Sequence, residues 1–165
     1  MSQGKRPRLA PPRGLTLVEL AVGFAVLGIL VASAVPYMGE FIVNSRLRES
    51  GNTLFTETLI AQSEAVKRNT TVRVSTNGVT IQVLDLSSPT SPVLLREQVL
   101  LGNVRAPVAN FDLGPEGRPE PFGTGVSINL SLSNSSCSAS QRCPGLRVDA
   151  GGAVRLCPDQ QVACP

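Results

Sequence analysis

Hydrophobic and polar residues follow three different patterns along the chain, and each pattern predicts a different structure. The first is a run without any charge, LAVGFAVLGILVASAVPYMG, over residues 20–39. A helix of that length spans about 30 Å, the thickness of a bilayer core, because each residue adds about 1.5 Å. This run predicts a membrane-inserted helix over residues 15–39.

The second pattern, over residues 40–68, is that of a helix with one apolar face. Apolar or small residues recur there at three- and four-residue spacing: Leu47, Gly51, Leu54, Phe55, Thr58, Ala61, Ala65 and Val66. Most charged residues of this stretch, Glu57 among them, lie elsewhere around the helix. We expect this half of the helix to pack one face on a folded domain and to leave the other in water.

From Thr70 onward apolar and polar residues alternate with a period of two, which predicts strands. Strands over 72–75 and 79–83 flank Asn77-Gly78, a strong hairpin signal. Further strands are expected over 93–100, 104–113 and 126–132, and the stretch 114–125, rich in Pro and Gly, is expected to form a loop without a strand. The domain over residues 40–165, with its helix at 40–68 and its β-rich part at 70–165, is therefore predicted to be α+β, with antiparallel sheets.

The charge of the chain is concentrated at its start. The first fourteen residues carry Lys5, Arg6, Arg8 and Arg13 and no acid. By the positive-inside rule this end lies in the cytoplasm and the C-terminal domain outside it. Without the first fourteen residues, the net charge of +3 becomes −1, with eleven Lys and Arg against twelve Asp and Glu. The basic balance of the whole chain is therefore an orientation signal and does not indicate a nucleic-acid partner. The chain has no His, which excludes most general-base chemistry.

Three interpretations compete for the apolar run. It could be a permanent single-pass anchor. It could be a secretory signal peptide cleaved after Ala34, since residues 32–34 read Ala-Ser-Ala, which would release a soluble periplasmic protein. The third interpretation depends on Glu19, a carboxylate at the head of the apolar helix. A carboxylate at membrane depth costs about 2.5–3.5 kcal/mol on insertion scales, so such residues usually have a function.

The sequence RGLTLVEL at residues 13–20 resembles the prepilin signature of type IV pilins and of type II secretion pseudopilins. The resemblance implies that residues 1–14 are a leader, that prepilin peptidase cuts between Gly14 and Leu15, and that the new N-terminus is methylated. It also implies that Glu19 pairs with the terminal amine of a neighbouring subunit during assembly. Leu15 replaces the usual Phe. Pro36 falls where pilins commonly kink the helix.

The stretch LIAQSEAVKRNTTV at residues 59–72 resembles the corresponding helix end in the GspH/FimT branch of pseudopilins and minor pilins. The resemblance implies a pilin-like fold and a structural subunit of a type IV pilus or a type II secretion pseudopilus. Such a subunit is a single-pass protein of the inner membrane with a periplasmic C-terminal domain. Its partners are prepilin peptidase and other pilin or pseudopilin subunits. No enzymatic activity, cofactor or metal is expected.

All four cysteines lie in the last 29 residues: Cys137, Cys143, Cys157 and Cys164. An even count on the outer side of a membrane predicts two disulfides. A zinc site is the rival interpretation, but no His and no Cys-x-x-Cys pair accompanies them. Three connectivities are open. A hairpin predicted from residues 146–148 and 154–156 places Cys143 and Cys157 symmetrically about its turn, which favours that pair and leaves Cys137 with Cys164.

The same hairpin carries an alternative function. Some members of the FimT branch resemble DNA receptors for natural transformation and carry a Gly-Arg-x-Arg motif near the C-terminus. The matching stretch here is GAVR at residues 152–155, in which Arg155 fits the motif and Ala153 replaces its first Arg. Arg147 is expected on the same face as Arg155, with Arg142 close by in sequence. Two or three arginines on one hairpin are more often solvated surface, because phosphate binding needs several converging cations. No aromatic platform for stacking single-stranded bases is expected either, since the one Tyr of the chain, Tyr37, lies beside the membrane segment.

Overall fold

The computed structural model describes residues 14, 16–88, 90–133, 137–138, 140–162 and 164, and for residues 35–37 the backbone alone. One helix, α1 (Leu17–Arg68), is followed by ten strands. The chain divides into two compact units, Met1–Met38 and Gly39–Pro165, so α1 contributes to both.

In the first unit α1 is apolar, and none of the described residues of that unit buries it. Every described side chain of α1 as far as Ala34 is exposed. The segment Leu17–Ala34 is long enough and apolar enough to cross a membrane, as judged by its length and composition. Its exposed residues include Leu17, Phe24, Ile29 and Leu30. Such a surface needs an apolar environment from outside the chain.

In the second unit α1 packs one face on a β-rich body, as predicted. Its fully buried residues follow the expected spacing: Leu47, Leu54, Thr58, Ala61 and Ala65. Two expectations were wrong. Val66 is exposed, and Glu57 is buried, because Arg96 of strand β3 (Val93–Val99) reaches the Glu57 carboxylate with two hydrogen bonds of 2.9 Å.

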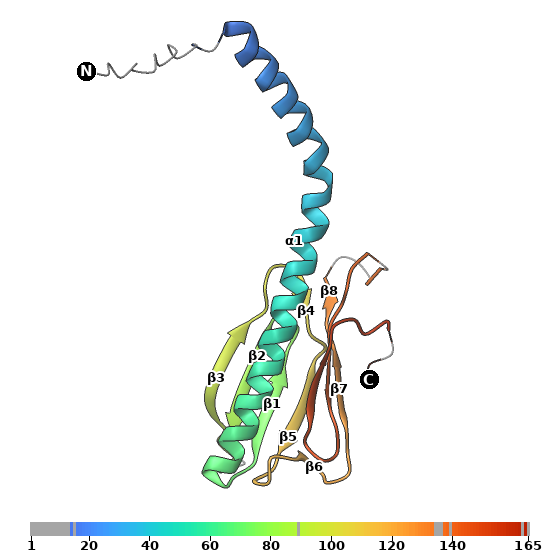
Figure 1. Cartoon of the computed structure of the whole chain (residues 1–165). Coiled ribbons are helices and arrows are strands. Elements are labelled where there is room, and N and C mark those ends of the chain that lie inside the picture. The colour runs from blue at the N-terminus through green and yellow to red at the C-terminus, as the bar shows by residue number, and fades with distance from the viewer. Residues whose placement is uncertain are drawn as a thin grey trace, which may run out of the picture. The chain divides into compact units, whose positions relative to one another are not determined.

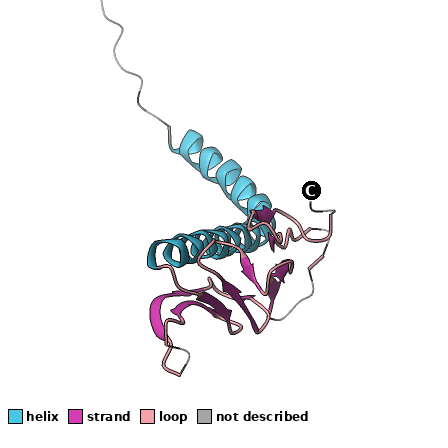
Figure 2. Ribbon diagram, turned by 90° about the horizontal axis from the view of Figure 1, so that it is seen from below, coloured by secondary structure: helices cyan, strands magenta, loops and turns pink. Residues whose placement is uncertain are grey.

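A five-stranded antiparallel sheet lies against this helix, in the order β3-β2-β1-β5-β6 (Figures 1 and 2). The predicted hairpin around Asn77-Gly78 is confirmed, with Gly78 at φ +78° between two of its strands. The strands are β1 (Val72–Thr76), β2 (Thr80–Asp85), β3, β5 (Ala109–Leu113) and β6 (Pro119–Glu120). The two-residue strand β6 corrects the prediction that residues 114–125 contain no strand, since it pairs with β5.

The remaining strands form a three-stranded sheet, β10-β9-β7, and a two-stranded pair, β4-β8, all antiparallel. They are β4 (Val104–Arg105), β7 (Val126–Asn129), β8 (Ser131–Leu132), β9 (Gly145–Val148) and β10 (Val154–Cys157). The predicted strands 104–113 and 126–132 are therefore each divided between two sheets. Pro107 interrupts the first, because it has no N–H to donate to a strand partner.

The second unit has two ends, a near end and a far end. The near end holds α1 residues 39–47 together with the loops at 77–79 and 100–103 and the segment of Ser140 and Arg142. These loops are joined by hydrogen bonds from Leu100 N to Val79 O (2.8 Å) and from Asn44 Nδ2 to Ser140 O (3.0 Å). The far end holds the end of α1 with the loops at 114–118 and 149–153 (Figure 1). There, Gln62 Nε2 donates to Gly117 O (2.5 Å) and to Gly152 O (2.7 Å).

Candidate functional site

The start of α1 carries a helix cap immediately after the predicted cleavage site. The Thr16 hydroxyl accepts a hydrogen bond from the backbone N–H of Glu19 (3.2 Å), and Thr16 O accepts from Leu20 N (3.1 Å). Threonine at the N-cap with glutamate three residues later is the sequence signature of a capping box, and the hydrogen bond to the Thr16 hydroxyl is its first half. The sequence analysis missed this role of Thr16, although the spacing T-x-x-E indicates it. Gly14 is exposed, and Leu15 lies outside the described residues.

Glu19 is exposed on the first turn of α1, among apolar side chains. A carboxylate in the first turn is favoured by the positive end of the helix dipole. Within the part of the chain that the structure describes, no side chain pairs with this carboxylate. A side-chain partner for this carboxylate would have to come from outside the described residues or from another molecule.

Pro36 lies inside α1, near the boundary between the two units. The helix runs through it from Leu17 to Arg68. The kink expected at Pro36 stays a prediction.

The C-terminal hairpin brings two of the three candidate DNA-binding arginines together. Strands β9 and β10 pair Arg147 directly opposite Arg155, while Leu146 faces Leu156 and Val148 faces Val154. Leu146 and Val148 are buried, as period-two alternation requires, and Val154 and Leu156 are half-buried. Arg147 and Arg155 therefore share the opposite face of the hairpin, as predicted.

A shallow groove of about 420 Å³ runs over this face, lined by Ser127, Arg147, Asp149, Arg155 and Cys164, among others. Each arginine already interacts with a neighbour. Arg147 Nη1 donates to Asn129 Oδ1 (2.7 Å) and to Leu146 O (2.9 Å), and Arg155 Nη2 lies 3.9 Å from a carboxylate oxygen of Asp149. The groove thus carries two cations and one carboxylate.

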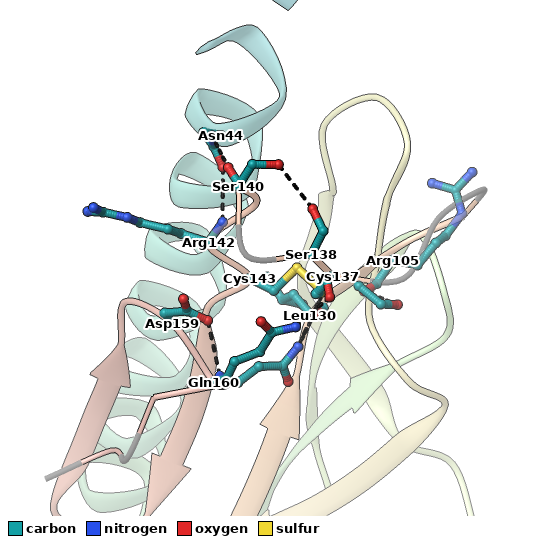
Figure 3. Close-up of a disulfide and its surroundings, with 12 residues drawn as sticks. Asn44, Arg105, Leu130, Cys137, Ser138, Ser140, Arg142, Cys143, Asp159 and Gln160 are labelled. Carbon is teal, nitrogen blue, oxygen red and sulfur yellow. Dashed lines mark hydrogen bonds between the residues drawn. A yellow bond between two sulfur atoms is a disulfide. The ribbon is translucent and has the colours of Figure 1, made fainter. Parts of the chain in front are cut away.

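Arg142 does not join this pair. Its backbone N–H donates to Asn44 Oδ1 of α1 (3.0 Å), which holds it at the near end of the second unit. In Figure 3 its side chain points away from the neighbouring disulfide. The three arginines grouped from the sequence therefore belong to two separate surfaces.

The turn of the hairpin is fixed to α1 by Gln62, another residue that the sequence analysis missed. Gly152, with φ +90°, lies so close that a Cβ placed on it would be 2.5 Å from Gly117 O. The two carbonyl groups of Gly117 and Gly152 both accept from the Gln62 amide. Gln62 of α1 therefore fixes the position of the loop after β9, and through this loop the position of Arg147 and Arg155 on the two strands.

The four cysteines form two disulfides, as predicted, but the favoured pairing was wrong. Cys137 is bonded to Cys143 and Cys157 to Cys164, with Cα–Cα distances of 6.0 and 5.4 Å. The hairpin register explains the difference, because it places Cys157 opposite Gly145 and not opposite Cys143. Figure 3 shows the first disulfide beside Leu130 and Gln160. Each bond closes a short local loop, so neither ties the hairpin strands to each other.

Ionised side chains elsewhere in the second unit pair with one another. A hydrogen bond from Arg68 lowers the pKa of Glu64, and the backbone N–H of Ser87 lowers the pKa of Asp85. The Asp112 carboxylate raises the pKa of Arg73, which it meets at 2.6 and 2.8 Å. Of these interactions, the Arg73–Asp112 pair joins two strands, β1 and β5. Among the described residues, no three His, Cys, Asp or Glu side chains lie together in a way that could hold a metal ion.

Comparisons with known proteins agree on the kind of protein. Residues 50–160 match the sequence profile of the family described as type II transport protein GspH, and residues 11–35 match that of the prokaryotic N-terminal methylation motif. No curated protein gives a significant sequence match.

Two solved structures show the likeness in fold. The type IV minor pilin FimU of Pseudomonas aeruginosa strain PAO1 superposes with a TM-score of 0.58 at 16% identity, over 70% of this chain and 91% of that one. The minor pseudopilin EpsH of the Vibrio cholerae type II secretion system gives 0.54 at 11% identity, over 69% and 94%. The α+β, pilin-like fold predicted from the sequence is thus confirmed. The chain belongs to the GspH family of pilin and pseudopilin subunits and carries an N-terminal methylation motif ahead of the family's domain.

Proposed function

We propose that this chain is a minor pilin or pseudopilin that prepilin peptidase cuts between Gly14 and Leu15, and that then assembles into a type IV pilus or a type II secretion pseudopilus. The mature chain starts at an N-methylated Leu15, with residues 15–39 in the inner membrane and residues 40–165 in the periplasm. It performs no chemistry of its own. The observation that carries the proposal is the methylation motif at residues 11–35, which contains Gly14 and Glu19 and leads into an exposed apolar helix.

The roles proposed for the N-terminal residues follow from charge. Cleavage removes four cations and creates an amine next to the capped start of α1. The Glu19 carboxylate has no partner among the described side chains, so an amine from a neighbouring subunit can neutralise it in an apolar filament core. Pairing of this kind fixes the axial register between subunits, because an unpaired charge in such a core is costly.

The mass of the mature N-terminus tests the proposal directly. A chain that begins at Leu15 and carries one added methyl group is expected. A chain that begins at Val35 would instead support cleavage by signal peptidase after Ala34 and a soluble product. An uncut chain would support a permanent anchor.

The role of Glu19 needs a separate experiment. In Glu19→Gln the carboxylate is lost and the shape is kept, so we expect normal processing and a strong loss of the subunit from purified filaments. Glu40→Gln is the matched control, because Glu40 is another exposed carboxylate of α1. Equal incorporation of both variants would contradict the assembly role of Glu19.

A second candidate function is DNA capture during uptake, and the pairing of Arg147 with Arg155 across β9 and β10 favours it. The groove beside them also contains Asp149, which opposes phosphate binding. We expect salt-sensitive binding of duplex DNA by the full chain in detergent if this function is real, weakened by Arg147→Gln and Arg155→Gln. Arg142→Gln is the control, because Arg142 lies on another surface. No binding at low salt would exclude this function.

A further inference from the structure

Five arginines of the second unit form no ion pair with a described carboxylate, and four of them, Arg46, Arg48, Arg105 and Arg142, lie at or beside its near end. Within the described part of the chain, no carboxylate oxygen lies within 4.0 Å of Arg46, Arg48, Arg105 or Arg142. Most other cations of this unit do have such a partner, as Lys67, Arg68, Arg73, Arg96, Arg118 and Arg155 show. The fifth arginine without a carboxylate partner, Arg147, lies on the β9–β10 hairpin and donates to Asn129 Oδ1 and to Leu146 O. The other four are therefore concentrated at one end of the unit.

Contacts between loops and helix bring three of the four together. Arg46 of α1 packs on Gly102, whose Cβ position would be 2.9 Å from the Arg46 guanidinium. Arg105 Nη1 donates to the carbonyl of the same Gly102 (3.2 Å). Arg142 is held two residues along α1 by Asn44. Figure 3 shows the side chains of Arg105 and Arg142 extending outward on either side of the Cys137–Cys143 disulfide.

Exposed apolar side chains lie at the same end. Phe41 is 74% exposed, Leu101 46% and Val108 83%. Leu101 belongs to the loop that Arg46 and Arg105 contact, and the hydrogen bond from Ala106 N to Gly78 O (2.9 Å) places the segment before Val108 beside the hairpin turn at 77–79. The near end therefore combines guanidinium groups with large apolar side chains, a combination typical of membrane-interface surfaces.

We propose that the near end of the second unit docks on the headgroups of an anionic bilayer while the subunit is still in the membrane, with Arg46, Arg105 and Arg142 on lipid phosphates and with Leu101 in the interface. The inference rests on the proposed membrane anchoring of residues 15–39. Docking goes beyond anchoring, because a domain that is anchored by its helix can also move freely above the membrane without touching it.

The position of the near end favours a bilayer as the occupant. Helix residues 39–47 directly follow the segment proposed to span the membrane, so a bilayer surface is within reach at high effective concentration. The charge of the near end is complementary to that of an anionic bilayer, since four arginines outnumber the nearby Glu40 and Glu49. Asp159 lies farther from α1 residue Asn44, beside Gln160 (Figure 3). Each basic residue near an anionic surface shifts the docked-to-free ratio about fivefold.

A single tryptophan reports the docked state, because the chain has no Trp of its own. The full processed chain with Leu101→Trp is reconstituted in vesicles of phosphatidylcholine, with or without phosphatidylglycerol, that contain a brominated lipid as quencher. Strong quenching is expected with phosphatidylglycerol, and little without it or at high salt. Val66→Trp is the control reporter, because Val66 is exposed at the far end of α1 and should stay unquenched.

The cations are tested in the Leu101→Trp background. Arg46→Gln with Arg142→Gln removes no hydrogen bond made by a described side chain and should lower the docked-to-free ratio roughly twenty-five-fold. The matched control, Lys67→Gln with Arg118→Gln, removes two cations elsewhere and should leave quenching unchanged. Circular dichroism checks that each variant is folded. If Leu101→Trp itself disturbs the loop, Val108→Trp replaces it as the reporter.

The outcomes separate the two proposals. If the chain does not float with the vesicles, membrane anchoring is wrong, and docking fails with it. If it floats but Leu101→Trp stays unquenched, or is quenched equally without phosphatidylglycerol, anchoring stands and docking is overturned. Quenching that both double variants reduce equally would also overturn it, since it would then depend on total charge and not on the near end.

Discussion

The two halves of α1 share one secondary structure and differ in almost everything else. As far as Ala34 every described side chain is exposed and, apart from Glu19, none is charged. From Leu47 to Ala65 one face is fully buried, and a buried carboxylate, Glu57, has its partner within the fold. The second half obtains its stability from its own domain. The first half needs an environment that the described part of the chain does not supply, which for an apolar surface is lipid or other apolar helices.

The largest expected effect is a loss of stability from a Leu→Ala substitution, which should occur in the buried half of α1 and not in the exposed half. Leu54→Ala should lower the free energy of unfolding of the second unit by about 2–5 kcal/mol, because Leu54 is fully buried and its loss leaves a cavity. Leu27→Ala, in the exposed half, should leave that value unchanged. Chemical denaturation of the detergent-solubilised chain, followed by circular dichroism, measures both. Equal losses would show that the halves are not energetically separate.

Gly152→Ala tests how firmly the second half holds the hairpin. The new Cβ would lie 2.5 Å from Gly117 O at a backbone with φ +90°, so we expect a loss of about 2–3 kcal/mol in unfolding free energy. Gly78→Ala is the control, since Gly78 also has a positive φ but has open space around its Cβ position. Its loss should be about 1 kcal/mol, from backbone strain alone. A similar loss in both variants would contradict the close approach at Gly152.

Glu57→Gln addresses the buried carboxylate. The amide cannot accept both charged hydrogen bonds from Arg96, which is itself partly exposed and can turn to water, so the expected loss is about 1–2 kcal/mol. Glu49→Gln on the exposed face should change the unfolding free energy by less than about 0.5 kcal/mol. Thermal melts of the two variants side by side give the difference. Identical melting temperatures would mean that the pair contributes nothing.

The smallest expected effect is a pH dependence confined to the second unit. The pKa of Asp85 is lowered, first by the Ser87 N–H, and that of Glu64 by Arg68. Each contribution is therefore complete above the ordinary carboxyl pKa of about 4 and is lost as the pH falls through the lowered value. The melting temperature should fall in that acidic range, and Asp85→Asn should flatten the fall. A melting temperature that rises on acidification would contradict this.

Local signals in the sequence predicted much of this molecule. The spacing of Leu47, Leu54, Ala61 and Ala65 identified the packed face, and Asn77-Gly78 identified the first hairpin, because both depend on neighbours within a few residues. Glu57 was misplaced because its partner, Arg96, lies 39 residues away on β3. Pro107 could have divided the strand expected over 104–113, since its missing N–H is a local signal that the sequence analysis passed over.

The candidate site was predictable to a similar extent. The motif around Gly14 and Glu19 is contiguous, so it was found from the sequence alone. The disulfide pairing depended on the hairpin register, which places Cys157 opposite Gly145, two residues along the strand from Cys143. Arg142 was grouped with Arg147 by proximity in sequence, but its contact with Asn44 spans 98 positions and only the fold reveals it.

The Thr16 cap has a consequence for maturation. The hydroxyl that accepts from the Glu19 N–H lies on the downstream side of the proposed cut, so removal of residues 1–14 would leave this capping hydrogen bond in place. Cleavage by the peptidase would then change the charge at the N-terminus, because four cationic side chains are removed and one new amine is created. The capped start of α1 would be the same before and after cleavage. The cap of α1 would therefore already be formed in the precursor, and cleavage would change the charge at the start of the helix and not the cap.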